Sequence, residues 1–169
     1  RNNGGGALED ARLMSGLFIK KGPIVQIKDH QGKVDILRDV DSSVTYDGPL
    51  IVMTNRFSAS ASEILAGALQ DYKRAIIVGG EFSHGKGTVQ AVLDLNRSNP
   101  RAALVGGMGI GALKVTIQKF YRVTGASTQY KGVTPDIILP DPFAYTKSRE
   151  KDLENSLKWD QVKALPYTV

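Results

Sequence analysis

The sequence predicts an α/β layered domain, and three observations lead to this class. Short apolar runs at 50–53 and 75–78 have the length and composition of buried strands. Between them, apolar residues recur at helical spacing from Ile64 to Tyr72. Later in the chain, residues 113–121 alternate between apolar and polar, as in a strand with one face in water. Strands that alternate with helices are typical of layered α/β domains.

The N-terminal part supplies a helix and a hairpin ahead of the first apolar run. Three glycines, Gly4 to Gly6, precede Ala7-Leu8-Glu9-Asp10-Ala11, which indicates a glycine turn that leads into a helix. Residues 24–28 and 33–37 alternate around Asp29-His30-Gln31-Gly32. This pattern predicts a β-hairpin with His30 in the turn.

The second half is mostly extended. We expect strands at 88–95 and 113–121, and a last short strand within 135–140 that closes the sheet. A glycine-rich stretch over 99–111 is interpreted as a loop between two strands, with no assigned role. From 146 to 163 charged residues dominate and apolar residues are sparse, so a marginal helix or a tail is expected there.

Composition places the chain among ordinary soluble domains and excludes several chemistries. Its 169 residues are enough for one hydrophobic core. The net charge of +5 comes from basic residues that are scattered and not interleaved with aromatics, so nucleic acid binding is not expected. There are no cysteines, and the two histidines lie too far apart for a metal motif, so we expect neither metal nor cofactor. No stretch has the pattern of a signal peptide or a membrane span.

The most informative stretch is Ser58-Ala59-Ser60-Ala61-Ser62-Glu63, which follows the apolar run at 50–53 and opens the helix. Ser60 therefore lies where a strand turns into a helix. That position exposes a side chain at the carboxyl edge of a sheet, beside the free N–H groups of the first helical turn. The Ala61 amide is a candidate donor to an oxyanion.

Lys86, between Gly85 and Gly87, is the candidate base for Ser60. A serine hydroxyl is a weak nucleophile unless a neighbouring base takes its proton. A lysine does this only when neutral, and the ordinary lysine pKa of about 10.4 requires burial among apolar neighbours to bring this about. Gln90 lies four positions after Lys86 and shares a face with it in either a helix or a strand.

Taken alone, each of these patterns is more often structural than catalytic. Ser60-Ala61-Ser62-Glu63 matches the capping box S-x-x-E, in which the serine and the glutamate only begin a helix. Lys86 in a glycine loop is also compatible with an ordinary solvated lysine.

Two other enzyme or binding classes are weaker. Residues 80–86 match G-x-x-x-x-G-K, but Gly87 stands where a phosphate-binding loop needs Ser or Thr, and the following residues look extended, so nucleotide binding is not expected. A Ser-His-Asp hydrolase would use His84 with Asp71 or Asp94, yet no G-x-S-x-G motif surrounds Ser60.

Taken together, six blocks of sequence resemble the tail-specific, or carboxy-terminal processing, serine proteases. The resemblance extends from Arg1 to about Pro140, with a weaker similarity over 155–160. The blocks stand in the order that the family has: Asn2–Gly6, Gly48–Leu50, Arg56–Ile64, Gly85–Gln90, Thr116–Arg122 and Lys131–Ile137.

The resemblance implies a role for each site residue. Ser60 is the nucleophile, Lys86 is the general base, and Gln90 positions the lysine. Gly6 is the preferred oxyanion donor among Gly4, Gly5 and Gly6, and acts together with Ala61. The loop over 79–85 is one residue longer than the family pattern, so Ser58 and Ser62 stay open as alternative nucleophiles.

The resemblance also refines the fold and implies the biological setting. It implies a crotonase-like spiral α/β core, with a mixed sheet flanked by helices, over residues 1–140, and a C-terminal charged helix or tail over 141–169. Such an enzyme is a Ser-Lys endopeptidase that cleaves proteins near their unstructured, apolar C-termini. It is expected to act in the periplasm or elsewhere outside the cytoplasm. The full-length protein is expected to lie close to a membrane. The family carries a PDZ domain that is absent here, so the chain is expected to be a fragment. The alternative is a catalytically latent peptide-binding core.

Overall fold

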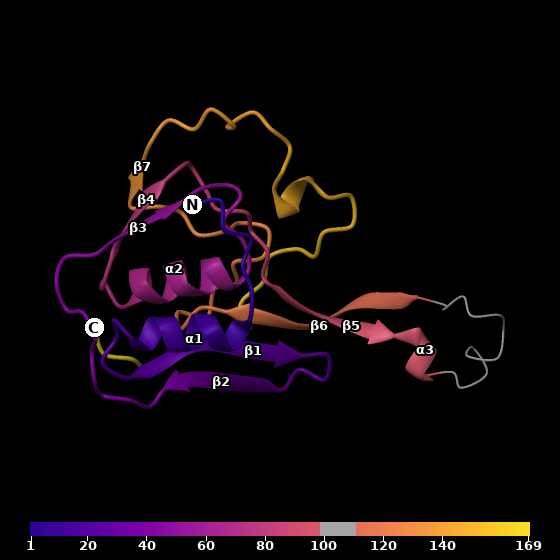
Figure 1. Ribbon diagram of the computed structural model, residues 1–169, viewed down its shortest axis with the longest axis horizontal. Helices are drawn as coiled ribbons and strands as arrows, with labels where there is room; N and C mark the ends of the chain where they lie inside the picture. The colour runs from indigo at the N-terminus through magenta and orange to yellow at the C-terminus, as the bar shows by residue number, and fades with distance from the viewer. Residues whose placement is uncertain (99–110) are drawn as a thin grey trace.

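A computed structural model describes residues 1–98 and 111–169 (Figure 1). The loop expected over 99–111 lies outside the described residues except for Gly111. The elements follow one another along the chain as α1 (Leu8–Gly16), β1 (Gly22–Asp29), β2 (Val34–Asp39), β3 (Ile51–Thr54), α2 (Ala61–Asp71), β4 (Ile76–Gly79), β5 (Thr88–Asp94), α3 (Leu95–Ser98), β6 (Ala112–Tyr121), β7 (Ile137–Ile138) and the 3-10 turn η2 (Glu150–Asp152).

Two sheets enclose a layer of helices. One sheet is antiparallel with strand order β2-β1-β6-β5, and the other is parallel with order β3-β4-β7. Helices α1 and α2 lie between them, and α2 contacts both β1 and β4 (Figure 1). The α/β layering expected from the sequence is confirmed. The expectation of a single mixed sheet was wrong, because the helix layer separates the parallel strands from the antiparallel ones.

The hairpin of β1 and β2 forms as the alternating pattern predicts. Its turn places His30 at the tip, and Asp29 Oδ1 accepts hydrogen bonds from the N–H groups of Gln31 and Lys33, both at 2.9 Å. Gly32 adopts a φ of 85°, a conformation that glycine reaches without a steric penalty.

The main core lies where α2 meets the two sheets. The apolar face of α2 carries Ile64, Ala68 and Leu69, each at most 5% exposed. Ile77 of β4 and Phe120 of β6 pack into the same cluster from opposite sheets. Packing therefore fixes α2 on both sides. This holds the N-terminus of the helix, and any functional group there, in a defined position.

Residues 141–169, which we name the C-terminal strap, contain the turn η2 and no α-helix. The strap is nevertheless fastened to the core. Arg149 Nε donates to the Ser83 carbonyl at 2.9 Å, and Trp159 Nε1 donates to the Ser127 carbonyl at 2.9 Å. Its sparse apolar residues do not form the continuous stripe that a packed helix requires, and the contacts of Phe143 with Phe57 and of Tyr167 with Tyr72 add to the polar ones.

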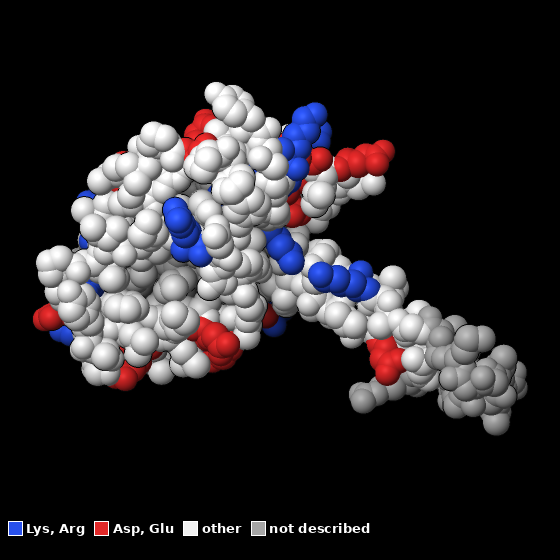
Figure 2. Space-filling view, turned by 45° about the horizontal axis from the view of Figure 1, so that its top comes forward, with Lys and Arg blue, Asp and Glu red and all other residues white. Residues whose placement is uncertain are grey.

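Strands β5 and β6 extend beyond the rounded body as a two-stranded arm (Figures 1 and 2). Along the arm, Val92 pairs with Lys114 and Ala91 pairs with Val115, so one face is partly polar and the other apolar. The strand predicted at 113–121 is confirmed, but the prediction of a single face in water was wrong along the arm, where Leu113 is 51% exposed and Ile117 is 42% exposed because no other layer covers them. Over the described ranges, no helix combines the length and the apolarity that crossing a bilayer requires.

Candidate active site

The site is built on the turn that joins β3 to α2. Ser60 directly precedes α2 and has φ 58° and ψ −117°. A residue with a Cβ is strained in this region of backbone space, at a cost of about 1–3 kcal/mol, and such strain is concentrated at functional sites. The turn holds the Ser60 side chain at the N-terminus of α2, where it is half-buried.

The three neighbouring serines have different surroundings. Ser58 is 2% exposed, and its Oγ accepts a hydrogen bond from the Asn55 N–H at 3.1 Å, so this hydroxyl closes a turn. Ser62 lines a cavity of about 190 Å³ between α1 and α2. Ser60 lines a different cavity, and of the three serines it alone shares that cavity with Lys86.

The cavity that contains Ser60 has a volume of about 200 Å³. It brings together all five residues that the sequence singled out: Gly6, Ser60, Ala61, Lys86 and Gln90. Its apolar wall and remaining lining come from Leu8, Ile64, Thr88, Val89, Lys114 and Phe120. The cavity thus brings residues near the N-terminus together with residues around position 88.

Lys86 and Gln90 interact directly. The Lys86 Nζ donates a hydrogen bond to the Gln90 Oε1 at 2.9 Å. Lys86 is half-buried and Gln90 is exposed. The apolar enclosure that we expected around the lysine is therefore partial: apolar side chains line the cavity, but one side of it is open to solvent.

The N-terminal glycines lie against the Ser60 turn. A Cβ on Gly5 would stand 2.7 Å from the Ala59 carbonyl oxygen and 2.9 Å from the Ala61 nitrogen, and the φ of Gly5 is 98°. This close approach requires glycine. The segment is fastened there by the Ala59 N–H, which donates to the Asn3 carbonyl at 3.0 Å.

Of the three N-terminal glycines, Gly6 alone lines the cavity that contains Ser60. The Gly5 N–H donates to Asn3 Oδ1 at 3.0 Å and is therefore occupied. Gly6 lines the Ser60 cavity together with Ala61. Within residues 1–98 and 111–169, neither the Gly6 N–H nor the Ala61 N–H has a protein acceptor. Two unpaired donors beside a serine are what an oxyanion hole needs.

Sequence reasoning missed the wider role of Glu63. This side chain is 1% exposed. Its Oε2 accepts from the Ser60 N–H at 2.8 Å, which is the capping contact that the S-x-x-E pattern predicts. The same carboxylate also accepts hydrogen bonds from three groups of the loop that carries the lysine: the Ser83 hydroxyl at 2.5 Å, the Gly85 N–H at 2.7 Å and the Lys86 N–H at 2.9 Å.

Glu63 therefore joins the serine turn to the lysine loop. Burial raises the pKa of its carboxyl to about 7, although the hydrogen bonds from Ser83, Gly85, Ser60 and Lys86 each act to lower it. The only signal in the sequence was the capping pattern, which gives no information on a loop twenty residues further along the chain.

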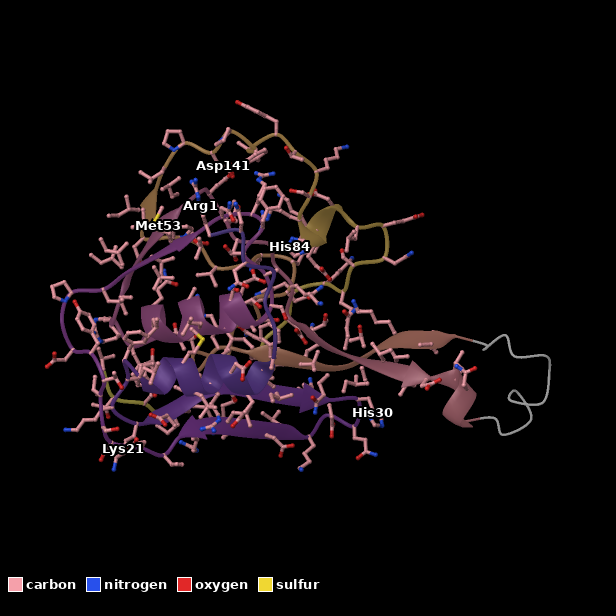
Figure 3. All side chains as sticks on the ribbon, in the orientation of Figure 1. Arg1, Lys21, His30, Met53, His84 and Asp141 are labelled. Carbon is pink, nitrogen blue, oxygen red and sulfur yellow. The ribbon has the colours of Figure 1, made fainter. Side chains whose placement is uncertain are left out.

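The arrangement does not bring the residues of the rival Ser-His-Asp hypothesis together. His84 lies near η2 (Figure 3), where its Nε2 is 3.6 Å from Glu150 Oε2, and it does not line the Ser60 cavity. Asp71, the last residue of α2, accepts hydrogen bonds from Arg122 at 2.5 and 3.0 Å and does not line the Ser60 cavity. The residues after Lys86 form strand β5, whereas a phosphate-binding loop opens a helix.

Comparison with known proteins places this geometry in context. The sequence profile described as Peptidase family S41 matches residues 1–139. A tail-specific protease of Haemophilus influenzae is 45% identical over 99% of this chain and 23% of its own length. A carboxy-terminal-processing protease of Bartonella bacilliformis is 40% identical over 85% of this chain and 30% of its own length. The chain thus spans less than a third of the length of these relatives.

Two solved structures share the fold of this chain. A photosystem II D1 C-terminal processing protease superimposes with a TM-score of 0.68 and 37% identity, over 82% of this chain and 33% of its own. A peptidase from Parabacteroides merdae superimposes with a TM-score of 0.63 at 18% identity, over 88% of this chain and 46% of its own, and shares the fold.

Proposed function

This chain belongs to peptidase family S41, and we propose that it is the catalytic core of a serine endopeptidase that cleaves proteins near their C-termini through a Ser60–Lys86 dyad. One observation carries the proposal. Of the three candidate serines, Ser60 alone shares a cavity with Lys86, and the same cavity is lined by Gly6 and Ala61, whose amides have no protein acceptor among the described residues. Nucleophile, base and oxyanion donors are the minimum set for acyl transfer.

In the proposed reaction, the neutral Lys86 amine takes the proton of the Ser60 hydroxyl while Oγ forms a bond to the substrate carbonyl carbon. The carbonyl electron pair moves to the oxygen, where the N–H groups of Gly6 and Ala61 hold the negative charge. When this intermediate collapses, the C–N bond breaks and the Lys86 ammonium gives its proton to the leaving amine. Water then repeats both steps on the acyl-serine and releases the new carboxyl end.

Two neighbours position these groups. The Gln90 Oε1 accepts a hydrogen bond from the Lys86 Nζ and so directs the amine within the cavity. Glu63 holds the backbone of both Ser60 and Lys86 through one buried carboxylate. Because both contacts precede substrate binding, little reorganisation is needed at the moment of reaction.

The biological setting is part of the same proposal, because the chain covers only a fraction of its relatives. We propose that the substrates are proteins with apolar, unstructured C-termini, that no cofactor takes part, and that the enzyme acts outside the cytoplasm, with its full-length form close to a membrane. The two-sheet arrangement around α2 is compatible with a crotonase-like spiral core, and we propose that fold.

A latent peptide-binding core is the second candidate, and the open side of the cavity favours it. Lys86 is half-buried here, whereas a lysine that acts as a base needs apolar enclosure. A chimera separates the two candidates: this chain replaces the corresponding stretch of the Haemophilus influenzae relative, to which it is 45% identical. Cleavage by the chimera and not by the isolated chain indicates latency of the core.

The test of the dyad uses the chimera and an unstructured peptide with an apolar C-terminus. Ser60→Ala and Lys86→Arg should each lower kcat/KM by about 10²–10⁴-fold, because arginine retains the charge but does not give up its proton. His84→Ala is the matched control and should cleave at close to the parent rate. If Lys86→Arg keeps the parent rate, or if His84→Ala loses as much as Ser60→Ala, the Ser-Lys assignment is wrong.

A further inference from the structure

The two peptide groups on either side of the Lys86 Cα are held by different parts of the chain. The Lys86 N–H donates to Glu63 Oε2 at 2.9 Å. The next N–H along the chain, that of Gly87, donates to the side-chain oxygen of Gln129, Oε1, at 2.8 Å. Because a peptide group is planar, holding both groups fixes the φ and ψ of Lys86. The direction in which the lysine side chain leaves the backbone is therefore fixed as well.

Gln129 is a buried amide whose side-chain donors are both used. The residue is 0% exposed. Its Nε2 donates to Glu150 Oε1 at 3.0 Å and to the Leu157 carbonyl at 2.9 Å, and both acceptors belong to the C-terminal strap. These two bonds determine which end of the amide faces Gly87. Turning the amide away would break three hydrogen bonds at once.

The contact between Gly87 and Gln129 leaves no room for a side chain on Gly87. A Cβ there would stand 2.5 Å from the Gln129 nitrogen and 2.7 Å from the Gln129 Cβ. The Gly87 carbonyl in turn accepts from the N–H of Phe120 at 2.9 Å, and Phe120 lines the cavity of Ser60. The glycine after the lysine thus permits a close approach to buried structure.

We propose that Gln129 is a positioning residue for Lys86, and that it acts by holding the Gly87 N–H. The inference rests on the proposed proteolytic function and deepens it, because it names a second support for the base. Glu63 holds the lysine backbone against the serine turn, and Gln129 holds it against the strap. A displacement of about 1 Å near a reacting group costs about 10²-fold in rate, so loss of this support slows the chemical step.

A glutamine with a structural role alone would lower stability and leave the turnover of the folded enzyme unchanged. Gln70 provides this comparison. Its Nε2 donates to the Thr134 carbonyl and to Asp136 Oδ1, both at 2.9 Å, and it does not line the cavity of Ser60. Gln70→Met therefore removes a bridging amide that has no contact with the lysine loop.

The experiment uses the chimera and the unstructured peptide with an apolar C-terminus. Gln129→Met keeps the length of the side chain and removes the oxygen that Gly87 needs. Gln129→Glu keeps an oxygen but sets a second carboxylate against Glu150. Adding Glu150→Gln to Gln129→Glu restores the pairing of an amide with a carboxylate, with the two partners exchanged. Steady-state kinetics gives kcat and KM, and hydrogen exchange followed by mass spectrometry gives the protection of residues 85–90.

We expect both single variants of Gln129 to lower kcat by about 10- to 100-fold, while KM stays within about twofold of the parent value. Exchange over residues 85–90 should become faster in the same variants. The double variant should recover at least about half of the lost activity on a logarithmic scale, because the two positions are coupled. Gln70→Met should keep the parent kcat and the parent exchange over 85–90.

Unchanged exchange over 85–90 in Gln129→Met would overturn the positioning role, and so would faster exchange at the parent kcat. A double variant no more active than Gln129→Glu would also count against it. Failure of the proposed function looks different: the unchanged chimera is then folded but leaves the peptide uncut, and the base and its support are withdrawn together. If the chimera cleaves and the Gln129 variants cleave as fast, only the positioning role is lost.

Discussion

Lys86 Nζ lies 2.9 Å from Gln90 Oε1, so the candidate base is held by a side chain that projects from strand β5 at the opening of the cavity. An amide oxygen accepts the hydrogen bond without adding charge. The hydrogen bond therefore orients the lysine without forming an ion pair with it. An ion pair would stabilise the ammonium form, whereas a base must be able to lose its proton.

Replacing this amide oxygen by a carboxylate should slow the reaction. In Gln90→Glu an ion pair would hold Lys86 as an ammonium, so we expect kcat to fall by about 10²-fold while KM stays close to the parent value. Gln90→Leu, which removes the contact and adds no charge, should be less affected. Steady-state kinetics on the chimera measures both, and equal activity of Gln90→Glu and the parent would contradict the role given to Gln90.

The glycine next to the Ser60 turn should tolerate no side chain. In Gly5→Ala the new Cβ would meet the Ala59 carbonyl oxygen at 2.7 Å, at a φ of 98°. We expect a loss of about 1–3 kcal/mol in the free energy of unfolding, together with lower activity. Gly4→Ala is the matched control, because a Cβ on Gly4 meets nothing within 4 Å. Urea denaturation measures both; similar values for the two variants would show that the close approach is not rigid.

The strained backbone at Ser60 should lower the free energy of unfolding. Both Ser60→Gly and Ser60→Ala remove the nucleophile, but glycine adopts a φ of 58° without steric cost and alanine does not. We therefore expect Ser60→Gly to be more stable than Ser60→Ala by about 1 kcal/mol, although glycine gains more entropy on unfolding. Thermal denaturation of the two inactive variants gives the comparison. Equal melting temperatures would mean that the turn relaxes once the hydroxyl is gone.

The buried carboxyl of Glu63 should make stability depend on pH. Its pKa is raised from 4.5 to about 7 in the folded protein, so the folded state binds the proton more tightly than the unfolded state. The stabilisation is fully present below about pH 4.5 and is lost as the pH rises through about 7, by about 3 kcal/mol at about 1.4 kcal/mol per pKa unit. Denaturation of the wild type and of Glu63→Gln at pH 5 and pH 8 measures it.

In that experiment the advantage of the wild type over Glu63→Gln should shrink between the two pH values. Glu81→Gln removes an exposed carboxyl from the same loop and should show no such change. Activity should move in the opposite direction to stability, because only the ionised carboxylate accepts all four hydrogen bonds from the serine turn and the lysine loop. A difference between wild type and Glu63→Gln that stays constant with pH would exclude titration of Glu63 in this range.

Local pattern was sufficient for most of the fold. The alternation around Asp29–Gly32 predicted the hairpin, and the apolar run at 75–78 predicted β4, because the periodicity of a strand depends on its own residues. The error lay in sheet partners. Whether two strands join one sheet depends on what packs between them, and neither strand of a pair carries that information in its own sequence.

The site shows the same division. Short motifs pointed to Ser60 and Lys86, the family resemblance implied the role of Gln90, and all three residues line one cavity. The three loop donors that meet Glu63 were not found, because a capping glutamate looks the same in sequence whether it serves one turn or two. The assignment of chemical roles to these residues stays a prediction until the variants above have been measured.

The fastening of the C-terminal strap has a practical consequence for anyone who shortens this protein. The family profile ends at residue 139, and a clone trimmed there would lack Arg149. The guanidinium of Arg149 holds the carbonyl of Ser83, whose hydroxyl in turn reaches Glu63. A protein that ends at this boundary would thus lose the contact that holds the Ser83 loop against Glu63. Lack of activity in such a truncated protein would not test the Ser60–Lys86 dyad.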